Sequence, residues 1–293
     1  MPPAITCIIG PTASGKSAIA LALAERTGGD VLCVDSMTVY RGMDIGTAKP
    51  SAVDRARVRH HGLDLVDADG SFAVAQYVTA ADAVIADATS RGVHLVAVGG
   101  TPMYFKALFE GLFEGPSADA ALRDELAARP VESLAEEVGR IDPAAALRID
   151  RNDQRRLIRA IEVFRLTGKP ISDHQREWGV QVRHAATWIG LQCEKEVLNR
   201  RINQRVRQML DDGWLDEVRQ LLARHGSFSR TAAMATGYAQ LASYLRGEGT
   251  LEDAFEATKI ATRQLANRQM KWFRRFTNVR WIAGNLASPD QLG

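Results

Sequence analysis

The chain has 293 residues and a mass of 32.1 kDa, which is enough for one large domain or two smaller ones. Hydrophobic residues make up 46% of it and charged residues 25%, a balance that excludes disordered and fibrous classes. The formal net charge of +2 is unevenly distributed, because residues 151–208 and 259–280 each sum to +7 and residues 1–150 to −7. Two basic segments favour a polyanionic partner, although solvated basic helix faces would give the same pattern.

The sequence predicts a cytoplasmic protein without a membrane partner. No apolar run approaches the roughly eighteen residues that a transmembrane helix needs, and residues 1–4 lack the basic stretch of a signal peptide. Cys7, Cys33 and Cys193 are too few and too scattered for a disulfide framework or a metal knuckle. Because Cys7 and Cys33 lie in apolar runs, we expect them to be small core residues in a reducing compartment.

Strands and helices are predicted to alternate at the start of the chain: strand 4–9, helix 18–25, strand 31–34, helix 72–91 and strand 93–98. Each strand is apolar on both faces, which indicates a parallel sheet covered by helices on both sides. After Gly115-Pro116 the chain is rich in Ala and Arg until a further strand at 187–192. We therefore predict an α/β core from residues 1–115 and 186–293, interrupted by a helical domain at 116–185.

Residues Gly10–Ser17 read GPTASGKS and match the phosphate-binding loop G-x-x-x-x-G-K-[ST] at every fixed position. The loop follows a strand and precedes a helix, so its N–H groups can surround a phosphate. Lys16 would supply a positive charge and Ser17 a hydroxyl ligand for Mg²⁺. The strand at 93–98 ends in Gly99-Gly100-Thr101-Pro102 and lacks the carboxylate with which a motor-type NTPase activates water. The loop thus predicts phosphoryl transfer or another diphosphate chemistry.

Three other residue pairs have both a functional and a structural interpretation. Asp35-Ser36 ends a strand at the ligand-binding edge of the sheet, where it could accept a proton from a substrate, but it is also ordinary turn chemistry. His60-His61 lack partners at metal-ligand spacing, so we expect surface polar residues. Trp272-Phe273 could stack on RNA, but helical spacing favours core packing.

Several segments together resemble one known family. They are GPTASGKS at 10–17, DSMTVYRGMDIGTAK at 35–49, GGTPMY at 99–104, NDQRRLIRAIEVF at 152–164 and ATRQLANRQMKWF at 261–273. The chain thereby resembles the tRNA dimethylallyltransferases, also called tRNA isopentenyltransferases, over nearly its whole length. That family transfers a dimethylallyl group from dimethylallyl diphosphate to N6 of the adenosine beside the anticodon, tRNA position 37. The resemblance implies a kinase-like P-loop core and a helical insertion that grips the anticodon stem-loop.

The resemblance also implies residue roles. The donor diphosphate would be held by Arg205 and by the loop residues Gly10, Pro11, Thr12, Ala13, Ser14, Gly15, Lys16 and Ser17, with Mg²⁺ near Ser17. The catalytic residues would be Asp35, Thr101 and Lys16, with Asp35 as general base. Contacts to tRNA would come from Asp35, Ser36, Met37, Thr38, Thr101, Arg123, Arg155, Arg156, Arg159 and Arg263.

Some of these roles have structural alternatives. Thr101 is also suited to cap a helix that starts at Pro102, and the arginines could be solvated helix residues. The chain departs from the family at Gln154-Arg155-Arg156, where Pro-Gln-Arg is common, and at Ala239, where a basic residue is usual. A base-specific contact at Arg155 is therefore left open, and Ala239 costs one expected phosphate or base contact.

The sequence as a whole favours a tRNA-modifying prenyltransferase that uses Mg²⁺, produces N6-isopentenyladenosine and diphosphate, and works as a monomer without an obligate protein partner. A small-molecule kinase would use the same loop for ATP, but it explains neither the basic segments nor the run at 35–49. An RNA-binding adaptor would leave the phosphate loop without a purpose.

Overall fold

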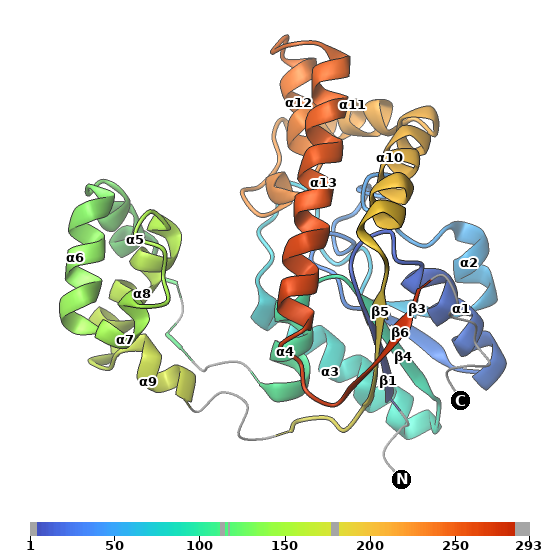
Figure 1. Ribbon diagram of the computed structural model, residues 1–293, viewed down its shortest axis with the longest axis horizontal. Helices are drawn as coiled ribbons and strands as arrows, with labels where there is room; N and C mark the ends of the chain where they lie inside the picture. Colours follow the sequence, from blue (N-terminus) through green and yellow to red (C-terminus); the bar gives the residue numbers. More distant parts are fainter. Residues whose placement is uncertain (1–4, 112–114, 117, 177–181, 285–293) are drawn as a thin grey trace. The chain divides into compact units, whose positions relative to one another are not determined.

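The computed structural model describes residues 5–111, 115–116, 118–176 and 182–284. The chain divides into two compact units, one formed by Met1–Leu108 with Ala185–Gly293 and the other by Phe109–His184. Figure 1 shows a sheet with helices in the first unit and helices in the second. The predicted fold class, a P-loop-like α/β core with a helical insertion, is confirmed.

Within the described residues, the first unit contains a sheet of six parallel strands in the order β3-β2-β4-β1-β5-β6. The strands are β1 (Ile5–Ile9), β2 (Asp30–Cys33), β3 (His60–His61), β4 (Leu95–Gly99), β5 (Thr187–Gln192) and β6 (Val279–Ala283). β4 is buried along its whole length and β2 likewise. Because β2, β4 and β1 are parallel neighbours in the sheet, their carboxyl ends lie side by side at one edge. The phosphate loop and Asp35 follow directly from this edge.

Helices cover both faces of this sheet, which is why its central strands are apolar throughout. Ile189 of β5 belongs to the core cluster that also contains Ile19 and Leu23 of α1. The preceding residue, Trp188, points to the opposite face, because successive side chains of a strand alternate. There its ring lies 5.8 Å from that of Phe105 in α4.

The helices of the first unit begin and end as their sequences dictate. Left-handed glycines, Gly28 (φ 61°) and Gly92 (φ 63°), end α1 and α3, and a capping box between Thr250 and Asp253 starts α13. The helices are α1 (Lys16–Thr27), α2 (Ala52–Arg57), α3 (Val74–Arg91), α4 (Pro102–Glu110), α10 (Lys195–Asp211), α11 (Trp214–His225), α12 (Tyr238–Leu245) and α13 (Leu251–Phe273), with a 3₁₀ turn at Ala232–Met234.

The second unit is helical in its described part. Its helices are α5 (Ala120–Ala127), α6 (Val131–Ile141), α7 (Pro143–Ala146), α8 (Gln154–Thr167) and α9 (Ile171–Arg176). Its own hydrophobic core includes Leu126, Leu134, Val138, Leu157 and Ile161. These apolar side chains recur at helical spacing, so each helix turns one apolar face inward. The faces pack together into a core that is separate from that of the sheet.

Several smaller expectations can be compared with the structure. Cys7 and Cys33 are buried, as predicted. Of the aromatic pair predicted to pack in the core, Phe273 is buried and Trp272 is partly buried. His60 and His61, expected to be surface polar residues, are partly buried and form β3, with His61 Nε2 2.9 Å from Asp30 Oδ2. No helix in the described ranges is both long and apolar enough to cross a membrane. Residues 1–4, used for the signal-peptide prediction, lie outside the described residues.

Candidate active site

The phosphate loop is a compact turn between β1 and α1. Gly10 has no room for a side chain, because a Cβ there would lie 2.9 Å from the carbonyl oxygen of Leu191. Ala13 (φ 62°) and Gly15 (φ 93°) adopt left-handed backbone conformations, which let the loop turn sharply. Gly15 starts α1 without a side-chain cap, so the first N–H groups of the helix are available to an anion.

Two side chains of the loop have properties expected of a phosphate site. The Ser14 hydroxyl is fully buried and makes no hydrogen bond within the described part of the chain. Lys16 Nζ donates to the carbonyl of Pro11 at 3.0 Å. Burial, followed by repulsion from Arg205, lowers the pKa of Lys16 from 10.5 to about 8, while Asp35 acts to raise it. Lys16 is therefore mainly protonated at neutral pH and is readily stabilised by added negative charge.

Asp35 lies just beyond β2, beside the phosphate loop. Its Oδ1 accepts the N–H of Met37 at 2.9 Å. Burial raises the pKa of Asp35, and the N–H of Met37, the charge of Lys16 and the N–H groups of Gly100 and Thr38 oppose this effect. The carboxylate is thus shielded from water, and burial outweighs the groups that act to lower its pKa.

Thr101 combines two of the roles that its sequence context allows. Its carbonyl accepts the N–H groups of Tyr104 and Phe105 at 3.0 and 3.3 Å, so its backbone starts α4. Its hydroxyl accepts the N–H of Ser36 at 3.0 Å and donates to Ser36 Oγ at 3.3 Å. The threonine hydroxyl therefore lies next to the Asp35-Ser36 pair.

The residues after Ser36 turn inward. Thr38 is 7% exposed, and its hydroxyl has no hydrogen-bond partner among the residues described. Met37 is partly buried. The predicted adenosine-contacting residues Asp35, Ser36 and Thr101 are thus brought together by β2 and β4.

Arg205 of α10 reaches the phosphate loop from above the sheet edge. Its Nη1 lies 3.4 Å from the Thr12 hydroxyl, and burial lowers its pKa while Asp35 opposes this. Arg263 of α13 instead donates to Asn203 Oδ1 at 2.7 and 3.2 Å and so ties α13 to α10. Of the two arginines, Arg205 has the contact expected of a donor-site residue.

Sequence reasoning missed Gln269 of α13. Its Oε1 accepts the N–H of Thr12 at 2.8 Å and its Nε2 donates to the carbonyl of Gly100 at 2.7 Å. It is 7% exposed, so both bonds are largely shielded from water. The available signal was its place inside the segment at 261–273, but only the fold brings that helix to the loops.

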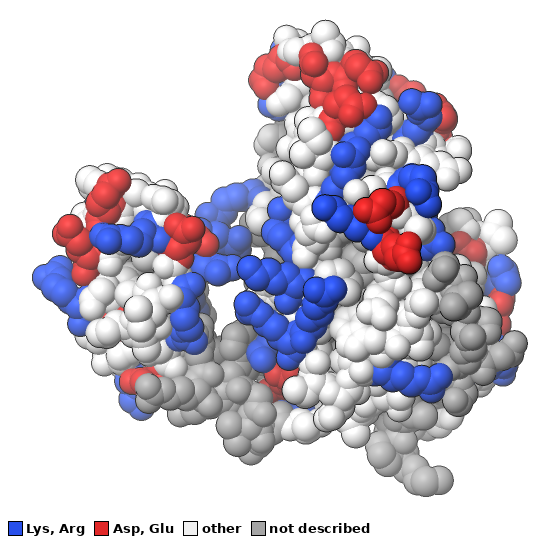
Figure 2. Space-filling model, viewed as in Figure 1, with Lys and Arg blue, Asp and Glu red and all other residues white. Residues whose placement is uncertain are grey.

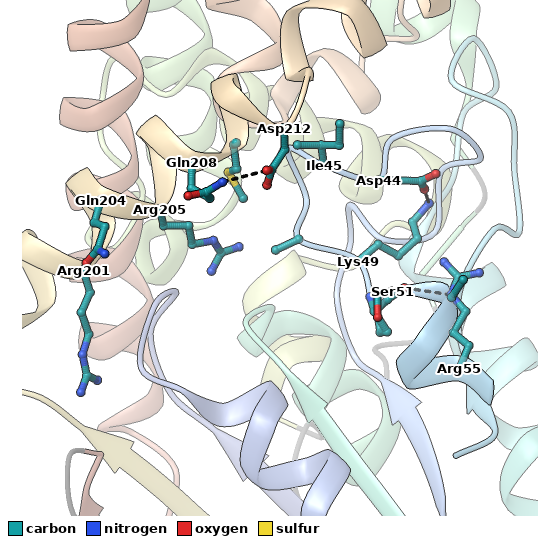
Figure 3. Close-up of a pocket in the computed structure, with 14 residues that line it drawn as sticks. Asp44, Ile45, Lys49, Ser51, Arg55, Arg201, Gln204, Arg205, Gln208 and Asp212 are labelled. Atoms are coloured by element: carbon teal, nitrogen blue, oxygen red, sulfur yellow. Dashed lines mark hydrogen bonds and ion pairs between the residues drawn. The ribbon is translucent and has the colours of Figure 1, made fainter. Parts of the chain in front are cut away.

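A cavity of about 860 Å³ lies between α10 and residues 44–55, and Arg205 points into it (Figure 3). Arg55 and Arg201 also line it, so it has several positive charges. Arg205 is the residue that connects this cavity with Thr12 of the phosphate loop.

The run at 35–49 is anchored by polar contacts of Lys49 and Glu217. The Lys49 ammonium donates to the carbonyl of Tyr40 and to Asp64 Oδ1, both at 2.7 Å. Glu217 of α11 accepts the N–H groups of Asp44 and Ile45 at 2.9 and 2.7 Å. These contacts fix the backbone that continues from the Asp35 site.

The arginines predicted to bind tRNA in the second unit differ in their surroundings. Arg123 donates to both oxygens of Glu162 at 2.8 Å, and Arg159 donates to Glu162 Oε2 at 2.6 Å. Glu162 is fully buried, and although burial raises its pKa, hydrogen bonds from the two arginines lower it overall. Arg155 and Arg156, in the first turn of α8, are exposed. Glu162 is thus a structural partner of Arg123 and Arg159 that the sequence did not reveal.

Acidic and basic side chains lie at opposite ends of α13 (Figure 2). On the face in Figure 2, Lys and Arg gather over the lower half of this helix, and Asp and Glu lie near its start. The helix begins with Glu252 and Asp253 and carries Lys271 in its last turn. Gln269, which contacts Thr12 and Gly100, lies in the basic C-terminal part of α13.

Comparison with known proteins now identifies the family. The family model for IPP transferase matches residues 38–276. The tRNA dimethylallyltransferase of Geobacter metallireducens is 42% identical over 95% of this chain and 92% of its own length. The chain belongs to the IPP transferase family. The tRNA dimethylallyltransferase of Corynebacterium jeikeium is 43% identical over 97% of this chain and 92% of its own length.

Solved structures of the IPP transferase family agree with this membership. The full-length tRNA isopentenylpyrophosphate transferase of Bacillus halodurans superposes with a TM-score of 0.73 at 37% identity, covering 99% of this chain and 93% of that one. A eukaryotic dimethylallyltransferase acting on tRNA gives a TM-score of 0.80 at 26% identity, covering 96% and 74% respectively. The resemblance stated from sequence is confirmed.

Proposed function

We propose that this IPP transferase moves a dimethylallyl group from dimethylallyl diphosphate to N6 of adenosine 37 in tRNA and releases diphosphate. As a member of the family, the protein is a prenyl-transferring transferase. The observation that carries the finer assignment is the position of Asp35. Its carboxylate is attracted by Lys16 of the phosphate loop and accepts the N–H of Met37 at 2.9 Å.

The donor side would stabilise the leaving group. As N6 forms a bond to the first carbon of the donor, the bond from that carbon to the diphosphate oxygen breaks and negative charge grows on the diphosphate. Lys16, Arg205 and the N–H groups at the start of α1 would stabilise this charge, and the contact between Arg205 and Thr12 supports this proposal. The Ser14 hydroxyl would supply a further hydrogen bond to a phosphate oxygen.

Asp35 would act as general base on the acceptor side. The amine of adenine is a poor nucleophile because its lone pair is delocalised into the ring. Once N6 attacks, its proton becomes acidic, so a carboxylate can remove it. The raised pKa of Asp35 makes it a better base than an exposed aspartate, and the nearby Thr101 hydroxyl would orient the amine.

The loop fits Mg²⁺ only when a diphosphate supplies most of the ligands. Within the described part of the chain, no group of three His, Cys, Asp or Glu side chains could hold a metal ion. Ser17, in the first turn of α1, is exposed and offers one hydroxyl. Mg²⁺ commonly keeps several waters and binds through substrate phosphates, which agrees with such a site. When bound, the ion would neutralise charge on the diphosphate.

The tRNA would be bound through its anticodon stem-loop. Arg155 and Arg156 at the start of α8 are the exposed cations best suited to it, since arginine can stack on a base or pair with its edge. Adenosine 37 must leave its stack to reach Asp35, which an anticodon loop permits at low energetic cost. We further propose that the protein acts as a monomer in the cytoplasm, where its tRNA substrate is found.

A thermal-shift experiment separates this function from that of a kinase. Dimethylallyl diphosphate with Mg²⁺ should raise the melting temperature of the protein, and tRNA should raise it further. The rise caused by the donor should disappear in Lys16→Ala but persist in Lys195→Ala, which alters an exposed lysine. A larger rise with ATP than with the donor, in the presence of tRNA, would favour the kinase instead.

A further inference from the structure

We propose that Gln269 is a positioning residue that holds the donor-binding loop and the acceptor-binding loop in register. This inference rests on the proposed function, because it assigns donor and acceptor to these two loops. Gln269 lies on α13, and its side-chain amide bridges segments that are far apart in sequence, at Thr12 and Gly100.

The bridge lies where the sheet can no longer connect the loops. β1 and β4 pair in parallel up to Ile9 and Gly99, and the two chains then separate into their loops. The Gln269 amide accepts from Thr12 N–H and donates to Gly100 C=O just beyond that last pair. A side-chain amide thus replaces the strand-to-strand hydrogen bonds at the point where they end.

The acceptor end of the bridge leads directly to the proposed catalytic groups. The Gly100 carbonyl that Gln269 binds shares a peptide group with the N–H of Thr101, whose hydroxyl accepts from Ser36. The N–H of Gly100 faces the Asp35 carboxylate closely enough to act against the rise of its pKa, and Asp35 Oδ2 lies 3.4 Å from the position of a Cβ on Gly100. Moving the Gly100 backbone would therefore displace both Asp35 and Thr101.

The donor end is equally direct. Thr12 belongs to the phosphate loop and also contacts Arg205 through its hydroxyl. There is little room for adjustment, because a Cβ on Gly100 would lie 2.5 Å from Gln269 Nε2 and 3.4 Å from Asp35 Oδ2. Gln269 and Asp35 are thus closely packed against the Gly100 backbone.

Such a bridge matters because alkyl transfer needs the two reactants aligned at about 3–3.5 Å. The diphosphate is fixed by one loop and the adenine amine by the other, so their separation depends on how the loops are joined. A misplacement of about 1 Å can lower the rate roughly 10²-fold. Neither substrate needs to touch Gln269 for this effect.

The test compares Gln269→Met with Gln264→Met, an exposed glutamine on the same helix. Gln269→Met keeps the size of the side chain and removes both hydrogen bonds. We expect its single-turnover rate, at saturating tRNA and dimethylallyl diphosphate, to fall about 10²-fold. The dissociation constants for both substrates should stay close to those of the parent, and Gln264→Met should match the parent throughout.

A pH profile provides a readout that a purely structural role would not move. Moving the Gly100 backbone, which packs against Asp35, takes its N–H away from that carboxylate and would raise the pKa of the carboxyl, so the acid limb of the single-turnover rate should shift to higher pH in Gln269→Met. If this variant does not fold, Gly100→Ala should give the same slow rate by displacing the Gln269 amide.

The outcomes separate the two proposals. If the parent protein forms no prenylated tRNA, the proposed function fails. If the parent is active and Gln269→Met keeps its rate and its pH profile, the bridge has no positioning role and this inference is overturned while the function stands. A variant that only weakens donor binding, with an unchanged saturated rate, would also overturn it.

Discussion

Replacing Lys16 by methionine should make the protein more stable and far less active. Burial, followed by repulsion from Arg205, lowers the pKa of Lys16 from 10.5 to about 8. At about 1.4 kcal/mol for each pH unit, this difference corresponds to a penalty of about 3 kcal/mol for keeping the ammonium charged in the folded state. Methionine removes that penalty and also the hydrogen bond to Pro11, which contributes about 1 kcal/mol. The expected net gain at pH 7 is therefore about 2 kcal/mol.

The gain should depend on pH in a defined direction. Above about pH 8 folded Lys16 loses its proton, while the unfolded chain keeps it up to about 10.5. The parent protein thus gains stability as pH rises through this window, and the advantage of Lys16→Met shrinks toward zero. The measurement is urea unfolding of both proteins at pH 7 and pH 10, with Lys195→Met as an exposed control.

The same variant should lose catalysis. Removing one preorganised charge from a developing diphosphate typically lowers turnover about 10²–10³-fold. If Lys16→Met is less stable than the parent at pH 7, or if the difference is the same at both pH values, then Lys16 is not held as a desolvated cation. An unchanged single-turnover rate would show that it does not stabilise the leaving group.

Three further predictions concern other parts of the site. Asp35→Asn should bind tRNA and donor normally and lose at least about 10²-fold in single-turnover rate, and the parent rate should fall as pH drops through the raised pKa of Asp35. Binding of tRNA, measured by fluorescence anisotropy, should weaken steeply with salt, and Arg156→Glu should weaken it without changing donor binding. Glu162→Gln should lower the free energy of unfolding by about 3 kcal/mol, because it leaves Arg123 and Arg159 without their buried partner.

Each of these predictions has an outcome against it. If Asp35→Asn keeps most of its rate and Asp35→Ala is the slower variant, Asp35 positions the amine without accepting its proton. A flat salt dependence would mean that the basic segments are solvated faces. If urea unfolding of Glu162→Gln matches the parent, the bonds from Arg123 and Arg159 contribute nothing to stability.

The sequence predicted the parts of the site that lie within single contiguous motifs. The phosphate loop has its own backbone requirements at Gly10 and Gly15, so its residues alone indicate its shape. Asp35 ends an apolar strand, and the rule that ligands bind at the carboxyl edge of a parallel sheet placed it near that loop. Both inferences needed only local sequence and a general property of such sheets.

Contacts between distant segments could not be predicted. Gln269 joins Thr12 to Gly100 only because α13 packs near the sheet edge, and a glutamine in a helix has no local signature of such a role. Glu162 was hidden in the same way, because a carboxylate in an arginine-rich helix is usually exposed, whereas here it is buried and paired. His60-His61 form β3 through pairing with β2, although two polar residues do not indicate a strand.

The most direct test of the proposed function is to identify the nucleoside that the protein produces. Unmodified tRNA is incubated with isotopically labelled dimethylallyl diphosphate and Mg²⁺, the tRNA is digested, and the nucleosides are separated and identified by mass spectrometry. We predict label in N6-isopentenyladenosine from position 37 with the parent protein, and none above background with Asp35→Ala over the same time. Label on another nucleoside, or no labelled tRNA with a folded protein that binds both substrates, would contradict the proposed function.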